Sequence, residues 1–300
     1  MNKPRLRGVI AATATPLHPD YTPDLARLAM HCRALLDKGC DAINLLGTTG
    51  EATAFSVAQR LAVMRSIGAA GLPLNRFMVG TGVCALEDTV QLTRAAAHLG
   101  FAGALVLPPF FYPDVPAEGL IAHVDEIVRR AAHSKLAIYL YHIPQNTGVS
   151  WPLPVVSELR RRHPEVLVGL KDSAGDLAYS RAIASELPGF DVFPSSEATL
   201  GNATADGFAG CISATVNLTA AYAQAAWSSQ GSEAGTAALR KAADLRGLIA
   251  RYPLVASVKA ALAAAYNDAE WSRVALPLRP LSPEQSGALA EAVRERISQP

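Results

Sequence analysis

The sequence predicts an α/β fold, a (βα)8 TIM barrel with appended C-terminal helices. Eight short apolar runs alternate with longer stretches that have the periodicity of amphipathic helices. The runs are apolar on both faces, which is typical of parallel strands that are covered by helices. A strand–helix unit repeated eight times, with no low-complexity linker between units, indicates one closed barrel rather than several domains.

The runs that we predict to be strands are six to eight residues long. They cover residues 9–16, 42–47, 77–82, 103–109, 136–142, 166–173, 191–196 and 210–215. Three of the intervening helices carry start or stop signals. We expect Thr22 to be an N-cap with Pro23 at the first helical position, and Ser56 and Gln59 have the spacing of a capping box. A third helix is expected to end at Gly100.

The C-terminal part of the chain has a different pattern. From about residue 217 to the end, only helical patterns occur. We therefore expect a (βα)8 catalytic barrel over residues 1–217, and the last barrel helix with a C-terminal helical extension over residues 218–300.

The composition argues against several classes of partner. With 27 Lys and Arg against 26 Asp and Glu, the chain has no electrostatic footprint for nucleic acid or an anionic membrane. No run of about 18 apolar residues is present, and the apolar run near the N-terminus is too short for a signal peptide. We expect a cytoplasmic protein with no nucleic-acid or membrane partner.

The cysteines give no sign of a metal centre. Cys32, Cys40, Cys84 and Cys211 are scattered, without a CxxC pair and without the Cys and His spacing of a zinc site. We expect reduced thiols, no metal and no cofactor.

The stretch "VGLKDSAGD" (residues 168–176) places Lys171 near the end of the sixth predicted strand. The carboxyl ends of the strands carry the chemistry of such barrels. Burial disfavours an ammonium ion and lowers its pKa, so a neutral amine becomes available to attack a 2-oxo acid and form a Schiff base. Such an imine permits aldol cleavage, aldol addition or dehydration without a metal. The alternative is a surface lysine in an ordinary loop.

Two further strand ends carry polar groups. "GTTGE" (residues 47–51) follows the second strand, and Gly47, Thr48 and Thr49 are expected to form a turn that binds a carboxylate. "YLYHIPQNTG" (residues 139–148) follows the fifth strand, where the Tyr141 phenol is placed to relay protons. The alternatives are a plain glycine turn and a core tyrosine.

These three motifs, in this order, resemble the dihydrodipicolinate synthase/N-acetylneuraminate lyase family. The resemblance runs from "ATATPL" near the start to "LPLRPLSPEQ" near the end. It implies a class I lyase that binds pyruvate or another 2-oxo acid through an imine on Lys171, with Tyr141 as acid and base. Thr48 and Thr49 would hold the carboxylate, and the Ile212 carbonyl would face the reacting end. The resemblance also implies a homotetramer, a dimer of dimers, in which one relay tyrosine reaches the neighbouring subunit's site.

The loop after the fourth strand, "PPFFYPDVPAEG" (residues 108–119), departs from the family pattern. Phe110 and Phe111 stand where the synthases have a Tyr-Tyr pair. We assign the relay role to Tyr112, one residue later. The alternative is a relay through Tyr141, Thr48 and water.

Two further positions bear on the substrate. The synthases carry an arginine where this chain has Asn146, which offers hydrogen bonds but no charge. Ser195 and Ser196 end the seventh strand, where hydroxyls suit a polyhydroxy substrate or, alternatively, cap the next helix.

These observations favour a class I aldolase whose partner is a small-molecule 2-oxo acid. The substrate would be a 2-keto-3-deoxy sugar acid or a 4-hydroxy-2-oxo acid, with pyruvate released or used. Three alternatives stay open: a 2-keto-3-deoxy sugar acid dehydratase acting through the same imine, a dihydrodipicolinate synthase, and a non-catalytic 2-oxo acid binding protein.

Overall fold

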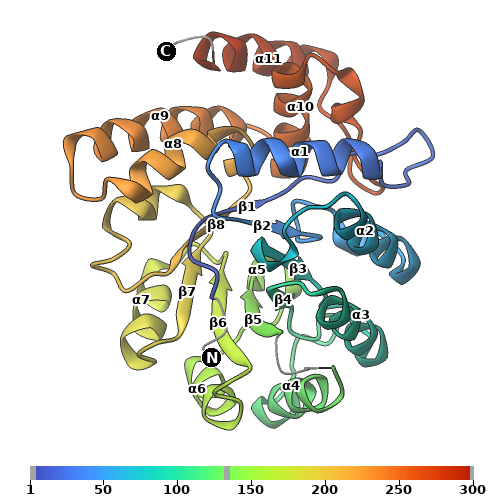
Figure 1. Ribbon diagram of the computed structural model, residues 1–300, viewed down its shortest axis with the longest axis vertical. Coiled ribbons are helices and arrows are strands. Elements are labelled where there is room, and N and C mark those ends of the chain that lie inside the picture. Colours follow the sequence, from blue (N-terminus) through green and yellow to red (C-terminus); the bar gives the residue numbers. More distant parts are fainter. Residues whose placement is uncertain (1–4, 132–135, 298–300) are drawn as a thin grey trace.

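Eight parallel strands form the wall of a barrel in the computed structural model, which describes residues 5–131 and 136–297 (Figure 1). They lie in one sheet in the order β7-β6-β5-β4-β3-β2-β1-β8. The Ala209 amide donates to the Val192 carbonyl at 2.9 Å, next to the gap between β7 and β8. The predicted (βα)8 barrel is therefore confirmed. The strands are β1 Gly8–Ala12, β2 Ala42–Leu45, β3 Phe77–Gly80, β4 Gly103–Val106, β5 Ala137–His142, β6 Leu167–Asp172, β7 Asp191–Pro194 and β8 Gly210–Ser213.

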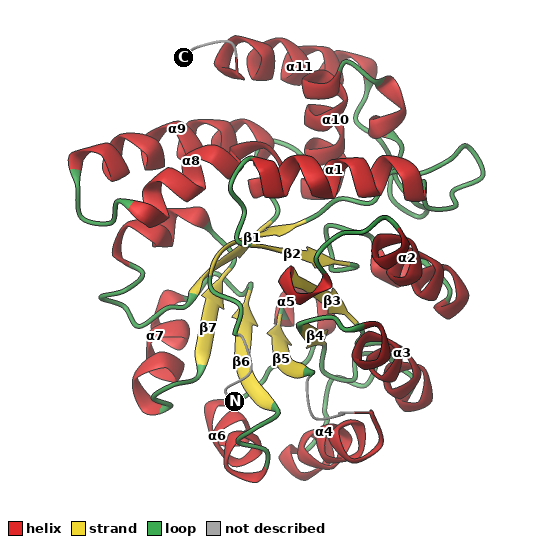
Figure 2. Ribbon diagram, viewed as in Figure 1, coloured by secondary structure: helices red, strands yellow, loops and turns green. Residues whose placement is uncertain are grey.

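Helices surround this barrel and continue beyond it (Figure 2). The helices of the strand–helix units are α1 Leu25–Asp37, α2 Val57–Ala69, α3 Leu86–Leu99, α4 Ala117–Ala131, α5 Pro144–Thr147, α6 Leu153–Arg162, α7 Leu177–Glu186 and α8 Val216–Ser228. Three more follow: α9 Glu233–Ile249, α10 Leu254–Tyr266 and α11 Pro283–Ile297. Within the described ranges, no single helix is long and apolar enough to cross a membrane, and α9 and α10 meet that test only as a pair bent by 112°.

The strands are apolar on both faces because both faces are buried. On β5, Ile138 and Leu140 point outward into the layer between strands and helices. Tyr139 and Tyr141 point inward and belong to a separate cluster that fills the barrel. This alternation decides which side chains reach the interior, and therefore the site, from each strand.

The barrel interior leaves no space for a side chain at Gly169 of β6. A Cβ atom on Gly169 would lie 2.3 Å from the Asp191 carbonyl oxygen and 2.7 Å from the Tyr139 ring. The β5–β6 register shifts at this level, between Ile138 and Tyr139. Beyond the shift, Tyr141 pairs with Lys171, so both side chains point into the barrel near its carboxyl end.

Two predicted helix ends are confirmed. The Ser56 hydroxyl accepts from the Gln59 amide at 3.2 Å, and the Gln59 side chain accepts from the Ser56 amide at 3.0 Å, which is a complete capping box for α2. Helix α3 ends at Gly100, whose φ of 90° lies in the left-handed region.

The predicted start of α1 is wrong by two residues. Asp24, not Thr22, is the N-cap, and its carboxylate accepts from the Arg27 amide at 2.9 Å. The Thr22 hydroxyl instead donates to Asp20 at 2.6 Å in the preceding turn. An aspartate carboxylate caps a helix N-terminus at least as well as a threonine hydroxyl, so the helix begins one residue after Asp24.

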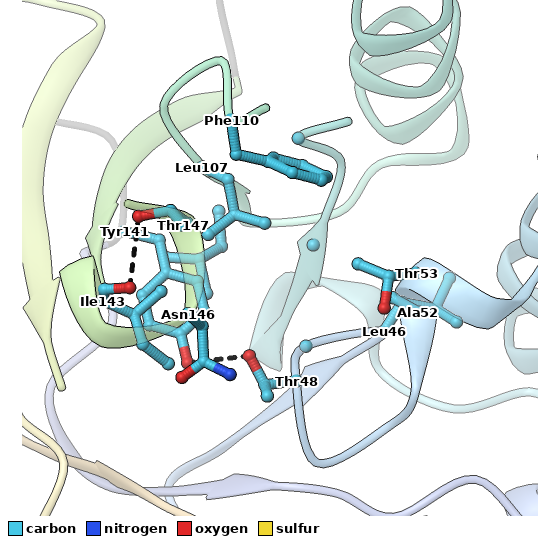
Figure 3. Close-up of a pocket in the computed structure, with 14 residues that line it drawn as sticks. Leu46, Thr48, Ala52, Thr53, Leu107, Phe110, Tyr141, Ile143, Asn146 and Thr147 are labelled. Atoms are coloured by element: carbon cyan, nitrogen blue, oxygen red, sulfur yellow. Dashed lines mark hydrogen bonds between the residues drawn. The ribbon is translucent and has the colours of Figure 1, made fainter. Parts of the chain in front are cut away.

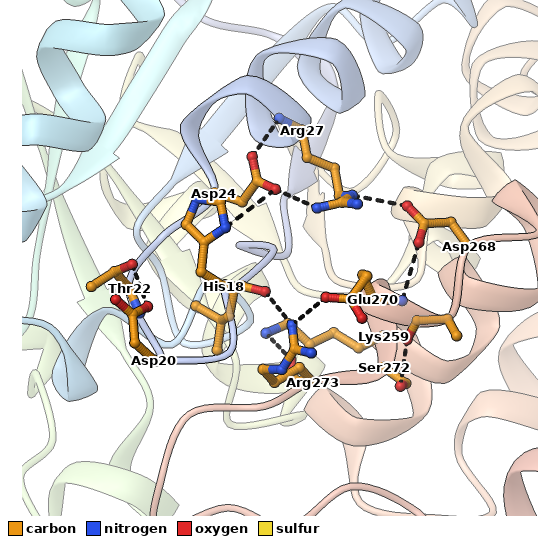
Figure 4. A network of polar contacts seen from close by, with 12 residues as sticks. His18, Asp20, Thr22, Asp24, Arg27, Lys259, Asp268, Glu270, Ser272 and Arg273 are labelled. Carbon is orange, nitrogen blue, oxygen red and sulfur yellow. Dashed lines mark hydrogen bonds and ion pairs between the residues drawn. The ribbon is translucent and has the colours of Figure 1, made fainter.

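Polar contacts fasten the C-terminal helices to the start of the barrel (Figure 4). Arg27 of α1 donates to Asp268 at 2.9 Å, and Arg273 donates to the Leu17 carbonyl at 2.7 Å. Lys259 of α10 donates to the Arg273 carbonyl at 2.7 Å. The segment after α10 is thereby held against the loop that follows β1, close to the carboxyl ends of the strands.

Candidate active site

Lys171 lies at the end of β6 and lines a cavity of about 570 Å³. The residue is only 3% exposed, and its Nζ lies 4.3 Å from the centroid of the Tyr141 ring. Its neighbours in the cavity include Thr49, Ser195 and Ile212, which come from three other strand ends. The buried Lys171 side chain therefore lines a cavity large enough for a small ligand.

The Tyr141 phenol lies between this amine and the turn after β2. Its oxygen lies 3.1 Å from the Thr48 hydroxyl. Burial raises the pKa of Tyr141, but the charge of Lys171 and hydrogen bonds from Thr48, Ser173 and Lys171 outweigh it, so the pKa is lowered overall. A buried phenol with a lowered pKa is suited to give and take a proton at the cavity wall.

The turn at residues 47–51 is held by its own backbone and by the loop that follows β1. The Glu51 amide donates to the Thr48 carbonyl at 3.0 Å, and the Thr15 hydroxyl donates to the Gly50 carbonyl at 2.9 Å. Thr48 and Thr49 both line the cavity with Lys171, whereas Gly47 lines an adjoining one.

Glu51 anchors the same turn to the C-terminal helices. Its carboxylate accepts from the Ala275 amide at 2.6 Å and forms an ion pair with Lys259. Both side chains of the pair are almost completely buried. Burial lowers the pKa of Lys259, and the Glu51 charge opposes that shift. Glu51 therefore positions the threonines and lies outside the cavity lining.

Asn146, on α5, lies at the boundary of two cavities. Besides the cavity of Lys171, it lines a second one of about 220 Å³, together with Tyr141 and Thr48 (Figure 3). The remaining walls of this second cavity are largely apolar, and they include Leu107 and Phe110. Asn146 thus lines both cavities together with Tyr141 and Thr48.

The two serines after β7 have different surroundings. Ser195 lines the cavity of Lys171, and so does Ile212 of β8. Ser196 caps the short helix Glu197–Asn202, where its hydroxyl accepts from the Ala198 amide at 3.3 Å. It lines a neighbouring cavity that contains Asp172 and Arg181. The structure therefore brings only Ser195 to the amine.

Tyr112 lies away from the cavity of its own chain. It is 74% exposed and packs edge-on against Phe111, with ring centroids 5.2 Å apart. Phe111 is 78% exposed and has a φ of 97°, an unusual value for a residue with a side chain. Within one chain, Tyr112 is therefore not among the residues that line the cavity of Lys171.

Sequence reasoning missed four polar residues that line the same cavity: Gln145, Ser173, Arg246 and Arg279. Ser173 follows Lys171 by two residues, and the alternation of strand side chains could have identified it. Arg246 and Arg279 come from α9 and from the segment before α11, and no local motif marks them. Among the described residues, no group of three or more His, Cys, Asp or Glu side chains is arranged to hold a metal ion.

Fold and site together define a class of protein. A Lys171 amine enters the (βα)8 barrel from β6 beside a Tyr141 phenol from β5, at the carboxyl ends of the strands, where enzymes with this fold carry their active sites. The comparisons with known proteins name the family within this class.

The chain belongs to the dihydrodipicolinate synthetase family, whose family model matches residues 5–296. A relative from Chloroflexus aurantiacus, described as an uncharacterized DapA-like lyase, is 35% identical over 97% of both chains. A 2-dehydro-3-deoxy-phosphogluconate/2-dehydro-3-deoxy-6-phosphogalactonate aldolase from Sulfurisphaera tokodaii is 25% identical over 63% of this chain and 62% of its own. The crystal structure of dihydrodipicolinate synthase from Agrobacterium tumefaciens superposes with a TM-score of 0.87 at 27% identity, covering 96% of this chain and 98% of that one. The protein is therefore an enzyme of a lyase and aldolase family.

Proposed function

We propose that this enzyme is a Schiff-base-forming class I aldolase that cleaves or forms a 2-oxo acid, with pyruvate as product or donor. The substrate class is a 2-keto-3-deoxy sugar acid or a 4-hydroxy-2-oxo acid. The single observation that carries the proposal is the buried Lys171 amine, 4.3 Å from the Tyr141 ring centroid and in one cavity with Thr48 and Thr49. The similarity to a sugar-acid aldolase supports the substrate class.

The chemistry begins with imine formation. The Lys171 amine attacks the C2 carbonyl, and the carbinolamine loses its oxygen as water after Tyr141 donates a proton, which leaves an iminium ion. The substrate carboxylate rests on the Thr48–Thr49 turn, and the Ile212 carbonyl faces the reacting end. The water lost here is regained when the imine is hydrolysed at the end of the cycle.

Carbon–carbon cleavage follows from the iminium ion. Tyr141 takes the proton of the C4 hydroxyl, the C3–C4 bond breaks, and its electron pair moves to the iminium nitrogen to give an enamine. An aldehyde leaves, C3 is protonated, and water releases pyruvate and the free amine. The hydrogen bond between Thr48 and Tyr141 gives the phenol a partner during each transfer.

Reductive trapping tests the imine directly. Incubation with pyruvate and borohydride should add one reduced pyruvyl group to Lys171, located by peptide mass spectrometry, and should abolish activity. Lys171→Met should show no adduct, whereas Lys38→Met, which removes an exposed lysine of α1's C-cap, should retain it. An unmodified Lys171 in the wild type would overturn the proposal.

Product analysis separates the alternatives. Pyruvate plus an aldehyde indicates cleavage, whereas a 2-oxo acid of unchanged carbon number that has lost water indicates a dehydratase using the same imine. Trapping without turnover on a broad panel of 2-oxo acids indicates a binding protein. Condensation with aspartate semialdehyde indicates a dihydrodipicolinate synthase, which the uncharged Asn146 disfavours.

The same proposal includes a homotetramer, a dimer of dimers, in the cytoplasm. The exposed Phe111 and Tyr112 support an aromatic contact with another copy of the chain, and the four free cysteines suit a reducing compartment. Sedimentation of the wild type beside a Phe111→Ser, Tyr112→Ser double variant tests the assembly. A monomeric wild type would contradict it.

A further inference from the structure

The cavity of Lys171 has a strongly basic lining. Lys171, Arg246 and Arg279 all line it, and none of its described lining residues is an aspartate or glutamate. In the proposed function, Lys171 becomes the imine and the Thr48–Thr49 turn holds the first carboxylate. Two guanidinium groups in the same cavity are then left without a role in the reaction.

Arg246 is fixed in place by a buried carboxylate behind it. One of its nitrogens, Nη1, donates to Glu197 at 3.1 Å and to the Thr215 hydroxyl at 3.0 Å. Glu197 also accepts from Ser213 at 2.6 Å and from Thr219 at 2.8 Å. The carboxylate is thus satisfied from several sides, and its side chain is 1% exposed, whereas that of Arg246 is 37% exposed. The guanidinium is oriented with part of its surface towards the cavity.

Arg279 has no comparable neutralising partner. Among the residues of 5–131 and 136–297, no carboxylate lies within ion-pair distance of it. It lies in the segment between α10 and α11, next to Leu278, which lines the same cavity. A second positive charge therefore reaches the cavity from the C-terminal part of the chain.

The adjoining cavity beyond Tyr141 and Asn146 has the opposite character. Its lining includes Leu46, Leu105 and Phe110, and no lining residue among those described is charged. Moving an ion from water into such apolar surroundings is strongly unfavourable. A substrate whose far end is charged would therefore extend towards the two arginines, and only an uncharged end would suit the apolar cavity.

We propose that Arg246 and Arg279 bind a second anionic group, a carboxylate or a phosphate, at the end of the substrate remote from the 2-oxo acid. This rests on the proposed function of Lys171 and makes the substrate a dianion. Arg246 supplies a planar donor that Glu197 already orients, and Arg279 supplies a second charge from the segment before α11.

Matched 2-oxo acids of two chain lengths test this in the intact enzyme. The pairs are 2-oxopentanoate with 2-oxoglutarate, and 2-oxohexanoate with 2-oxoadipate, with 2-oxo-4-phosphonobutanoate as the phosphate-like arm. The readout is the ligand concentration that gives half-maximal borohydride trapping on Lys171. We expect at least one dianion to half-saturate the enzyme at a concentration about tenfold or more below its neutral-ended partner, as expected for charge-assisted hydrogen bonds. The dianion with the lower half-saturating concentration shows whether the site prefers a carboxylate or a phosphonate.

Variants assign this preference to the arginines. Arg279→Gln should reduce it about tenfold, and Arg246→Lys, which keeps a charge beside Glu197, should reduce it less. Arg251→Gln removes an exposed arginine that follows α9 and does not line the cavity, so the preference should persist there. Two results would overturn the inference while leaving the imine intact. One is half-saturation of the wild type at equal concentrations of the dianionic 2-oxo acid and its neutral-ended partner. The other is a preference for the dianion that survives in the Arg279→Gln, Arg246→Lys double variant. Absence of trapping with pyruvate itself would instead overturn the proposed function.

Discussion

Lys171 of β6 and Tyr141 of β5 are paired across adjacent parallel strands, and the amine lies 4.3 Å from the centre of the phenol ring. Because strand pairing sets this distance, the two groups need no flexible loop to meet. The pairing of the two strands fixes the relative position of the two groups before a substrate binds, as a preorganised site requires.

Removing the phenol should slow the chemistry far more than it affects folding. We expect Tyr141→Phe to lower kcat by about 10²- to 10⁴-fold, the usual contribution of a general acid and base. Pyruvate should still be trapped on Lys171, more slowly. Tyr222→Phe, on α8 and outside the cavity lining, is the matched control. Wild-type kcat in Tyr141→Phe would show that the proton travels by another route.

The hydrogen bond from Thr48 should set the pH profile. It is one of the contacts that lower the pKa of Tyr141, so Thr48→Val should raise that pKa. The alkaline limb of the pH–kcat profile and the ultraviolet titration of the tyrosinate should then both move to higher pH. Thr48→Ser keeps the hydroxyl and should restore the wild-type profile. An unchanged profile in Thr48→Val would contradict this role.

Breaking the buried ion pair should destabilise the fold. Lys259→Met leaves the Glu51 carboxylate buried without its partner, which costs about 3–5 kcal/mol for a buried pair. The Glu51→Gln, Lys259→Met double variant should be more stable than the sum of the single changes predicts. Urea unfolding followed by circular dichroism measures both effects. Arg129→Ala breaks the exposed contact with Glu126 and should leave the midpoint unchanged.

The stability of the enzyme should fall in mild acid because of His31. This fully buried residue donates from Nε2 to Asn217 and accepts at Nδ1 from Tyr266, both at 2.8 Å, as a neutral ring. Burial lowers its pKa from 6.5 to about 4. As the pH falls below about 6.5, the unfolded chain takes up the proton first, so the stabilising contribution is full above that pH and is lost towards pH 4.

The size of this effect follows from the shift. Between about pH 7.5 and pH 5, His31 alone should lower the free energy of unfolding by about 2 kcal/mol. His31→Gln removes the titrating group, so the difference between the two pH values should shrink by that amount in urea titrations. The same pH dependence in wild type and variant would assign the acid sensitivity to other groups.

A charge at position 146 should change substrate choice. Asn146→Arg brings a guanidinium to the boundary of both cavities, where it could pair with the carboxylate of aspartate semialdehyde. We expect kcat/KM for that aldehyde to rise about 10- to 100-fold, as for an added charge-assisted hydrogen bond. Asn146→Ala should show no gain. If the arginine variant also shows none, Asn146 is not what disfavours dihydrodipicolinate synthesis.

The features that could be predicted from the sequence are those that depend on short stretches of the chain. The barrel is evident because each strand and helix carries its own hydrophobic period, and Lys171, Tyr141, Thr48 and Thr49 could be identified as candidates because each ends a strand. The start of α1 was misplaced because Thr22 and Asp24 compete for one cap, and a short motif does not rank them.

Arg246 and Arg279 were missed for a different reason. They reach the cavity only because the C-terminal helices fold back on the barrel, and that packing depends on distant contacts such as the one between Arg273 and Leu17. Ser196 shows the same limit at short range, since Ser195 lines the cavity of Lys171 and the next residue, Ser196, lines only the neighbouring one.

The division of the cavity wall between strand ends and the C-terminal helices has an evolutionary consequence. The amine and phenol sit on paired strands of the barrel, whereas Arg246 and Arg279 sit on α9 and on the segment before α11, outside the barrel wall. New selectivities could therefore arise in this lineage by substitution of these two arginines, and directed-evolution libraries confined to positions 246 and 279 should retune substrate preference without rebuilding the reacting centre.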